Sequence, residues 1–471
     1  MSGHHTLGTA SLRQRQASAV ADTALRGKLA RASEIFTTRK AGAFALVDDV
    51  DGLRQAARSI RSDINSRLPT VLERFADNVM AAGGNICWAK TGAEANAYIV
   101  NVAKRIGAKT VAKGKSMATE EIELNGALEA AGCEVVETDL GEWIIQLDEQ
   151  TPSHIIAPAI HLDRYDIARI FDERANAGGI EPIPEVMNAF ARGRLREKFL
   201  AAELGVTGCN LAIAESGSIL LVENEGNGRM SSTLPRVHIA VMGMERIVET
   251  WAEADLIVNL LARSGTGQHI SVYTNIVTGP RRPEDVDGPE EFHVVILDNG
   301  RSELLASDLH EMLDCIRCGA CLNVCPVYRQ TGGHAYGWVY SGPMGAVLTP
   351  LLAGHVEGSQ ELANASTLCG ACMDACPVGI PLQDLLLSLR RTKAAKAGAA
   401  EKAGWRAWSA AWSHRSTYEA SVVAATSPAR KLAGSRVATK LVPGAGRWAL
   451  GRELPTPASS SFRSRWKKGD I

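Results

Sequence analysis

The chain has 471 residues and is almost neutral, with 51 Lys and Arg against 52 Asp and Glu. This length is enough for a large hydrophobic core and for two or three domains. A net charge of −1 excludes a general affinity for polyanions, and the chain has no recognised nucleic-acid-binding module, so we expect no nucleic-acid partner.

No stretch of the sequence approaches the roughly 20 apolar residues that cross a bilayer, and the N-terminus lacks the apolar core of a secretion signal. We therefore expect no transmembrane segment and a cytoplasmic protein. Reducing conditions in the cytoplasm keep thiols free to bind metal and argue against a disulfide framework.

Residues 1–60 are predicted to be a helical N-terminal segment. Ala, Leu and Arg are prominent there, and apolar residues recur at loosely helical intervals. We expect this segment to pack on the domain that follows it. It shows no residue pattern that indicates chemistry.

Residues 61–303 alternate short apolar runs with helical stretches, which is typical of an α/β domain. Residues 92–106 and 117–131 are predicted helices that stop at Gly107 and Gly132. Repeated βαβ units with short connections predict an open, mostly parallel sheet covered by helices, with any ligand near the carboxyl ends of the strands. The predicted strands include residues 86–89, 110–112, 133–136, 235–242 and 293–298.

Residues 211–222 contain two apolar runs split by Glu-Ser-Gly, which predicts a strand, a turn and a second strand. The polar loop at residues 223–229 either exposes backbone N–H groups to an anion or is an ordinary turn. The chain has no G-x-G-x-x-G after a strand and no G-x-x-x-x-G-K-S/T, so a nucleotide site of either kind is unsupported.

Seven of the ten cysteines lie in two short clusters, and a proline follows the last cysteine of each. Three cysteines spaced by two residues bind three irons of a cubane, whereas the fourth, before proline, usually binds the other cluster. Paired C-x2-C elements also hold zinc, but zinc needs only four ligands and does not explain a run of four cysteines ending in Cys-Pro. The spacing therefore favours two 4Fe-4S clusters.

The cross-ligation rule assigns each cysteine to a site. The first site contains Cys315, Cys318, Cys321 and Cys376, and the second contains Cys325, Cys369 and Cys372. The second site is one ligand short, and the same spacing places Ser366 at the missing position. Its fourth iron takes a serine oxygen, a water or a side chain of a partner, or the cluster is of the three-iron 3Fe-4S type.

Residues 304–393 are predicted to form a helical ferredoxin domain, because the 43 residues between the clusters are too many for a compact ferredoxin. Residues 394–471 form a basic, Trp-rich C-terminal extension. From residue 390 onward the chain has 17 Lys and Arg, 4 Asp and Glu, and five of the nine tryptophans. We expect the extension to run over the surface, either docking on a partner or on a membrane periphery or remaining a solvated arm.

Several separated motifs resemble those of the lactate utilization protein B family, and the resemblance spans nearly the whole chain. The motifs are the two cysteine clusters and residues 114–117 (GKSM), 137–142, 152–161, 214–229, 297–302 (LDNGRS) and 461–466. The resemblance implies a lactate-utilisation domain, similar in fold to sugar-phosphate isomerases and CoA transferases, joined to a helical ferredoxin with two 4Fe-4S clusters. It also implies a cytoplasmic iron–sulfur component of a multi-subunit system that oxidises L-lactate to pyruvate. The implied partners are the other subunits and an electron acceptor.

Lactate oxidation moves two electrons, whereas each cluster carries one, so a separate group on this chain or on a partner must accept the hydride equivalent. The sequence shows no flavin or nicotinamide signature. Our first hypothesis is therefore an electron-transfer subunit. The alternative is that the α/β domain is itself an enzyme, in which Glu215, Asn224 and Arg229 bind a small anionic substrate and the clusters are structural.

Overall fold

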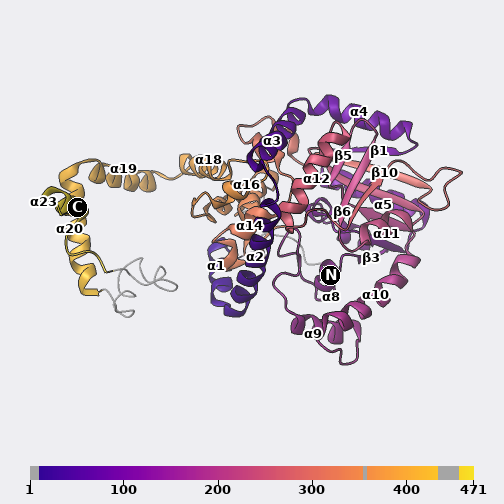
Figure 1. Ribbon diagram of the computed structural model, residues 1–471, viewed down its shortest axis with the longest axis horizontal. Helices are drawn as coiled ribbons and strands as arrows, with labels where there is room; N and C mark the ends of the chain where they lie inside the picture. Colours follow the sequence, from indigo (N-terminus) through magenta and orange to yellow (C-terminus); the bar gives the residue numbers. More distant parts are fainter. Residues whose placement is uncertain (1–9, 354–357, 433–455, 471) are drawn as a thin grey trace. The chain divides into compact units, whose positions relative to one another are not determined.

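The computed structural model describes residues 10–353, 358–432 and 456–470 (Figure 1). The chain divides into two compact units, Met1–Thr392 and Lys393–Ile471. The first unit contains the sheets and both cysteine clusters. Among the described residues, no helix is long and apolar enough to cross a membrane.

The first unit is built on a six-stranded sheet in which every neighbouring pair of strands is parallel. Its strands, in spatial order, are β1 (Asn85–Ala89), β10 (Glu291–Leu297), β7 (Val237–Gly243), β4 (Leu204–Thr207), β2 (Thr110–Lys113) and β3 (Glu134–Glu137). The central strands are buried on both faces, which explains why they are almost continuously apolar in the sequence. The predicted α/β fold with a mostly parallel sheet is confirmed.

Helices cover both faces of this sheet. Along β10, Val295 and Leu297 pack under the helices of one face, whereas Val294 and Ile296 pack under those of the other, as the alternation of side chains along a strand requires. One face carries α5 (Gly92–Ile106) and α7 (Leu124–Ala130), and the other carries α4 (Leu68–Ala81), α8 (Leu140–Leu147), α9 (Arg164–Ala175) and α10 (Pro184–Ala201).

The prediction of one helix over residues 117–131 is wrong. The structure has α6 (Met117–Glu121) and then α7, separated by Glu123 in the left-handed conformation with φ 53°. The break lets Glu121 lie buried against Arg301 while Leu124 and Leu128 still face the sheet. A long-range ion pair therefore overrides the local helical pattern.

A smaller sheet stands beside the first, with the order β8 (Ile247–Val248), β5 (Leu211–Ile213), β6 (Ser218–Glu223) and β9 (Tyr273–Val277). The predicted strand, turn and strand are confirmed as antiparallel β5 and β6. Their turn contains Gly217 with φ 65°, where a Cβ atom would lie 2.5 Å from the backbone of Asn78. Nearby helices are α11 (Asn227–Thr233), α12 (Trp251–Gly265) and α13 (Arg301–Leu305).

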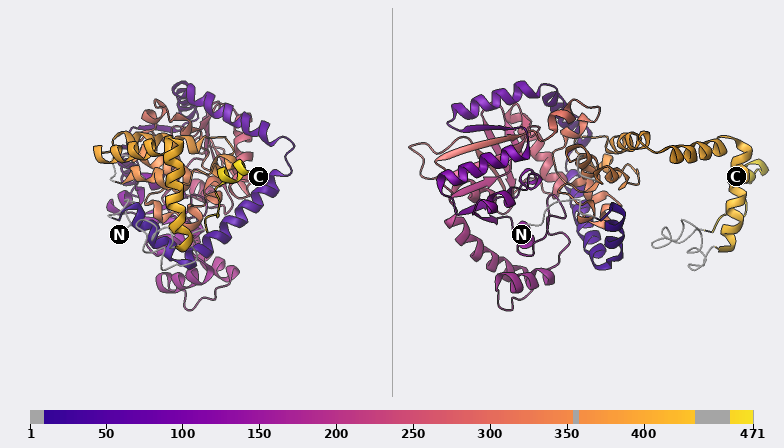
Figure 2. Two further views of the ribbon diagram at one scale, coloured as in Figure 1. Left: turned by 90° about the vertical axis from the view of Figure 1, so that its left-hand side faces the viewer. Right: turned by 180° about the vertical axis from the view of Figure 1, so that it is seen from behind.

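The N-terminal segment is helical, as predicted, and comprises α1 (Leu12–Ala21), α2 (Thr23–Phe44) and α3 (Val50–Ser66). Its packing differs from the prediction, because α2 lies against the cysteine-bearing helices as well as against α12 of the α/β domain. Figure 2 shows the indigo N-terminal helices beside the orange segment that carries the cysteines. Leu29 of α2 is fully buried in the core that surrounds Tyr328, so these two distant segments fold as one body.

The cysteine-bearing segment consists of short helices, which confirms the predicted helical ferredoxin. It contains three 3₁₀ helices, η1 (His310–Asp314), η2 (His334–Tyr336) and η3 (Ser359–Asn364). Its α-helices are α14 (Ala320–Val324), α15 (Tyr328–Thr331), α16 (Gly342–Leu352), α17 (Ala371–Ala375) and α18 (Leu382–Ala395).

The described part of the second unit is mostly helical, with α19 (Ala399–Ser413), α20 (Arg415–Leu432) and α23 (Phe462–Lys468). No secondary structure was predicted for these residues from the sequence, and their many alanines favour a helix. Trp405, Trp408 and Trp412 recur at helical spacing along α19, and the ring of Trp408 contacts the rings of the other two. Trp448 lies outside the described residues.

Candidate functional site

The two cysteine clusters fold into the same backbone motif twice. A residue with positive φ (Arg317, 59°; Leu368, 55°) precedes a cysteine, and a positive-φ glycine (Gly319, 77°; Gly370, 85°) follows it and begins a short helix. These helices are α14 and α17, and each ends at the cysteine that precedes proline. The left-handed residues turn the chain back on itself, so that cysteines close in sequence lie near one another.

The repeated motif places Ser366 in the position of Cys315. The backbone N–H of Arg317 donates to Cys315 Sγ at 3.4 Å, and the backbone N–H of Leu368 donates to Ser366 Oγ at 3.1 Å. The same amide therefore points at a sulfur in the first motif and at a hydroxyl oxygen in the second.

Four of the thiols surround one enclosed cavity, which is also lined by the apolar side chains of Ile155, Met312 and Met344. Burial, together with the nearby thiols of Cys376 and Cys315, raises the pKa of Cys318 to about 12. Burial also raises the pKa of Cys321 well above its ordinary value. The four thiols that line this cavity are those of Cys315, Cys318, Cys321 and Cys376.

The other three thiols form a second group. Burial raises the pKa of Cys372 to about 11, with the neighbouring Cys325 and Cys369 thiols adding to the effect. Cys369 differs from the other six because its side chain is exposed and because hydrogen bonds from the Ala371 amide and from Thr367 lower its pKa. Cys321 also lies near Cys372, so the two groups are adjacent.

The structure fits iron–sulfur clusters at both groups. A buried thiol with a raised pKa keeps its proton unless a metal cation replaces it, so closely packed buried thiols are suited to soft metal ions. Among the described residues, no three His, Cys, Asp or Glu side chains converge tightly enough to hold a single metal ion. In a cubane each thiolate binds a different iron, so its ligands need not converge on one point.

Cationic groups from several elements approach the first thiol group. Arg54 donates to the carbonyl oxygen of Cys376 at 2.8 Å, and Lys40 donates to that of Ala375. Arg246 donates to the carbonyl oxygen of Cys315 at 3.0 Å. Because these positive charges lie close to the thiols, they favour an anionic metal–thiolate group at this place.

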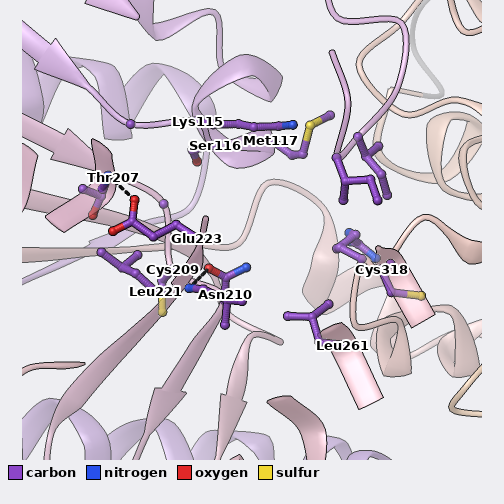
Figure 3. A pocket seen from close by; sticks show the side chains of 18 of the residues that line it. Lys115, Ser116, Met117, Thr207, Cys209, Asn210, Leu221, Glu223, Leu261 and Cys318 are labelled. Carbon is purple, nitrogen blue, oxygen red and sulfur yellow. Dashed lines mark hydrogen bonds between the residues drawn. The ribbon is translucent and has the colours of Figure 1, made fainter. Parts of the chain in front are cut away.

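A larger cavity of about 320 Å³ lies at the carboxyl ends of the parallel strands (Figure 3). The loops that follow β2, β4 and β7 line it, and it extends to Arg317 and Cys318 of the first cysteine motif. After β2, the next strand in the sequence, β3, lies on one side of β2 in the sheet. The later strands β4, β7 and β10 lie on its other side, so the direction of strand addition reverses between β2 and β4. Open α/β sheets bind ligands at such a reversal.

Glu215, Asn224 and Arg229, which the alternative hypothesis assigns to an anion site, do not converge. Glu215 accepts a hydrogen bond from the backbone N–H of Trp251 at 2.6 Å, and of the three only Asn224 lines the large cavity. The loop at residues 223–229 directs backbone N–H groups at a carboxylate of the protein itself. Glu223 accepts from the amides of Gly228 at 2.5 Å and Arg229 at 2.8 Å.

Two buried charge networks were missed by sequence reasoning. Arg301 donates to Glu121 and Glu245, with each ion pair at 2.8 Å and all three side chains at most 1% exposed. Lys113 is fully buried between Glu120 and Glu137, at 2.8 Å from each. The only available signals were single charged residues beside predicted strand ends, and these do not identify their distant partners.

Three family models match the chain. A LUD domain model matches residues 72–297, a 4Fe-4S dicluster domain model matches residues 311–380, and a model described as lactate utilisation protein B, C-terminal, matches residues 388–470. The dicluster match covers all seven cysteines of the two motifs.

The chain is similar to curated proteins over most of its length. Lactate utilization protein B of Bacillus pumilus (strain SAFR-032) is 46% identical over 466 residues, which is 98% of either chain. A protein of Escherichia coli (strain K12), described as an uncharacterized electron transport protein, is 48% identical over 418 residues, or 88% of this chain and 87% of that one.

A crystal structure of a DUF162 family protein from Deinococcus radiodurans aligns with 49% of this chain and 98% of that chain, at 15% identity and a TM-score of 0.27. That likeness is too weak to support any argument. The family models and the curated relatives confirm the resemblance in the sequence, and the chain belongs to the lactate utilization protein B family, with an iron–sulfur domain that follows its LUD domain.

Proposed function

We propose that the protein is the iron–sulfur electron-transfer component of a multi-subunit system that oxidises L-lactate to pyruvate, and that it works with the other subunits and an electron acceptor. The names of its relatives, which refer to lactate utilization and to electron transport, support this proposal. The observation that carries it is the adjacency of two thiol groups beside one core, in which only Cys369 of the seven thiols is exposed.

The proposed ligands follow the cross-ligation rule. The first cluster takes Cys315, Cys318, Cys321 and Cys376, and the second takes Cys325, Cys369 and Cys372. Both sets are supported by which thiols lie close enough to affect one another's pKa. Cys321 is affected by the other three thiols of the first set, and Cys372 by the other two of the second. When bound, such clusters accept and release one electron at a time.

Ser366 is the proposed fourth ligand of the second cluster. Its hydroxyl receives the amide hydrogen bond that a cysteine sulfur receives in the first motif, which supports an equivalent role. A serine oxygen is a harder and weaker ligand for iron than a thiolate, so we expect this iron to be the most easily lost.

The two sites differ in their access to solvent, which suggests a direction for electron flow. The first site is enclosed and borders the large cavity of the α/β domain, whereas the second reaches the surface through the exposed Cys369. We propose that the electron partner docks over the second site, because electron transfer needs the two redox groups to lie close together.

The test is Cys318→Ala in the full-length protein within its native system. We expect the iron content to fall and lactate-dependent electron flow to stop, since the first cluster loses a ligand. Cys87→Ala is the matched control, because Cys87 lies on β1, apart from both thiol groups. Normal growth on lactate with Cys318→Ala would overturn the proposed function.

A further inference from the structure

The large cavity contains positive groups whose hydrogen-bonding capacity is not used. Lys115, in the loop after β2, lines the cavity, and Figure 3 shows its side chain extended over it. No hydrogen bond or ion pair joins it to another described residue, although the carboxylates of Glu142 and Glu225 lie within its electrostatic range. Arg317, from the first cysteine motif, lines the same cavity, and its Nη1 is buried and has no partner among the described residues. A buried N–H donor without an acceptor is unfavourable, so Arg317 favours an acceptor in the cavity. Lys115 is half-buried and adds a second positive charge on the same cavity.

The carboxylates that line the same cavity are already engaged. Glu223 is held by the amides of the loop that follows it. Glu245 accepts from Arg301 at 2.8 Å and from Arg317 at 3.1 Å. Glu225 accepts from the amide of Leu140 at 3.0 Å, and Asp139 accepts from that of Glu142 at 3.1 Å.

The difference between the two kinds of group indicates the charge of the ligand. Each lining carboxylate has a donor, whereas Lys115 and Arg317 keep donors without acceptors. A cation would compete with Arg301 and Arg317 for Glu245, whereas an oxyanion would accept from the unused donors of Lys115 and Arg317. The cavity volume of about 320 Å³ is at the lower limit of ordinary small-molecule sites, so a metabolite-sized ligand fits better than a dinucleotide.

The cavity also reaches the first thiol group. Cys318 lines it, and at Gly265 of α12 a Cβ atom would lie only 3.1 Å from the carbonyl oxygen of Cys318. The helix therefore packs directly on the cysteine loop, and a bound molecule lies against that loop without intervening structure. A charge held in a cavity beside the thiols acts on them more strongly than a charge in bulk water, because the protein screens it less than water does.

We propose that this cavity binds a small organic anion, with carboxylate or phosphate oxygens between Lys115 and Arg317, and that its binding lowers the reduction potential of the first cluster. A negative charge beside the cluster stabilises the oxidised state relative to the more negative reduced state. The effect on the potential rests on the cluster ligands proposed above, whereas the binding of the anion does not.

Isothermal titration calorimetry of the full-length protein, prepared without oxygen, tests the binding. The carboxylate probes are pyruvate and L-lactate, and the phosphate probes are inorganic phosphate and ribose 5-phosphate. We expect saturable binding of one class at one site per chain, weakened about tenfold or more by Lys115→Met and largely kept by Lys115→Arg.

Lys104→Met is the matched control, since Lys104 is exposed on α5 and does not line the cavity. We expect it to bind like the unaltered protein. The proposal is overturned if none of the four probes binds saturably, or if Lys115→Met binds as tightly as the control.

Redox titration followed by EPR tests the coupling. At a saturating concentration of the probe that binds, we expect the signal of one cluster to move to lower potential while that of the other stays in place. Binding without any shift overturns the coupling but not the site. A protein that binds the probe but contains no iron overturns the proposed electron-transfer function, so the two failures are distinguishable.

Discussion

Replacement of Ser366 by cysteine tests the second cluster site most directly. Ser366 accepts an amide hydrogen bond at 3.1 Å, and Cys315, at the corresponding position of the first motif, accepts its bond at 3.4 Å. A sulfur at position 366 thus needs only the slightly longer contact that already exists at Cys315. Because Ser366 is half-buried, the larger atom fits without displacing the core.

We expect Ser366→Cys to complete a set of four thiolates. If the unaltered second cluster has three irons, the iron content rises from about seven to about eight per chain, because a cubane holds four irons, and the EPR signal of the three-iron cluster disappears. If it already has four irons, the content stays the same and the loss of iron on mild oxidation slows. Iron and sulfide analysis with EPR measures both outcomes.

Asn364→Cys is the control for an added thiol, since Asn364 is exposed and lies two residues before the predicted ligand position. We expect its spectrum and iron content to match those of the unaltered protein. If Ser366→Cys also gives the same iron content, EPR signal and oxidation rate as this control, the equivalence of Ser366 and Cys315 is refuted.

Three further changes have defined outcomes. The buried hydroxyl of Tyr336 lies near the second thiol group, so Tyr336→Phe should lower that cluster's potential by up to about 60 mV in a redox titration; no shift would exclude a tuning role. Arg301→Met leaves Glu121 buried without its cation and should lower the free energy of unfolding, measured with urea, by about 3–5 kcal/mol. Arg169→Met, at an exposed ion pair, should lower it by under about 1 kcal/mol, and equal decreases would contradict the reasoning. Burial lowers the pKa of His238 to about 3, so below pH ~6.5 the unfolded state binds more protons and the free energy of unfolding falls as the pH falls. His238→Gln should reduce the slope of the free energy of unfolding against pH by about 1.4 kcal/mol per pH unit, and an unchanged slope would refute the assignment.

The sequence predicted those features that depend on neighbouring residues. The helix over residues 92–106 agrees with α5, because its apolar residues recur on one face and Gly107, at φ 68°, ends it. The strands were recognisable because buried parallel strands are continuously apolar. The spacing of the cysteines also predicted the type of metal site, since the spacing of ligands within one loop is a local property.

The sequence was misleading where distant contacts decide the structure. The break at Glu123 follows Glu121, whose partner Arg301 lies far along the chain, and the packing of α2 on the cysteine-bearing helices has no local signal. Glu215, Asn224 and Arg229 are close in sequence, yet a tight strand–turn–strand and a loop that binds its own carboxylate direct them to different places.

The sequence by itself therefore determined the α/β class, the family, several strands and α5, and it indicated which thiols are expected to bind iron. Only the tertiary structure decided which charged groups share a site, as it places Lys115 and Arg317 in the lining of one cavity with Cys318. The physical reason is that hydrophobic periodicity and ligand spacing are properties of short segments. The pairing of charges depends instead on strand order and burial, which bring together residues about 200 positions apart.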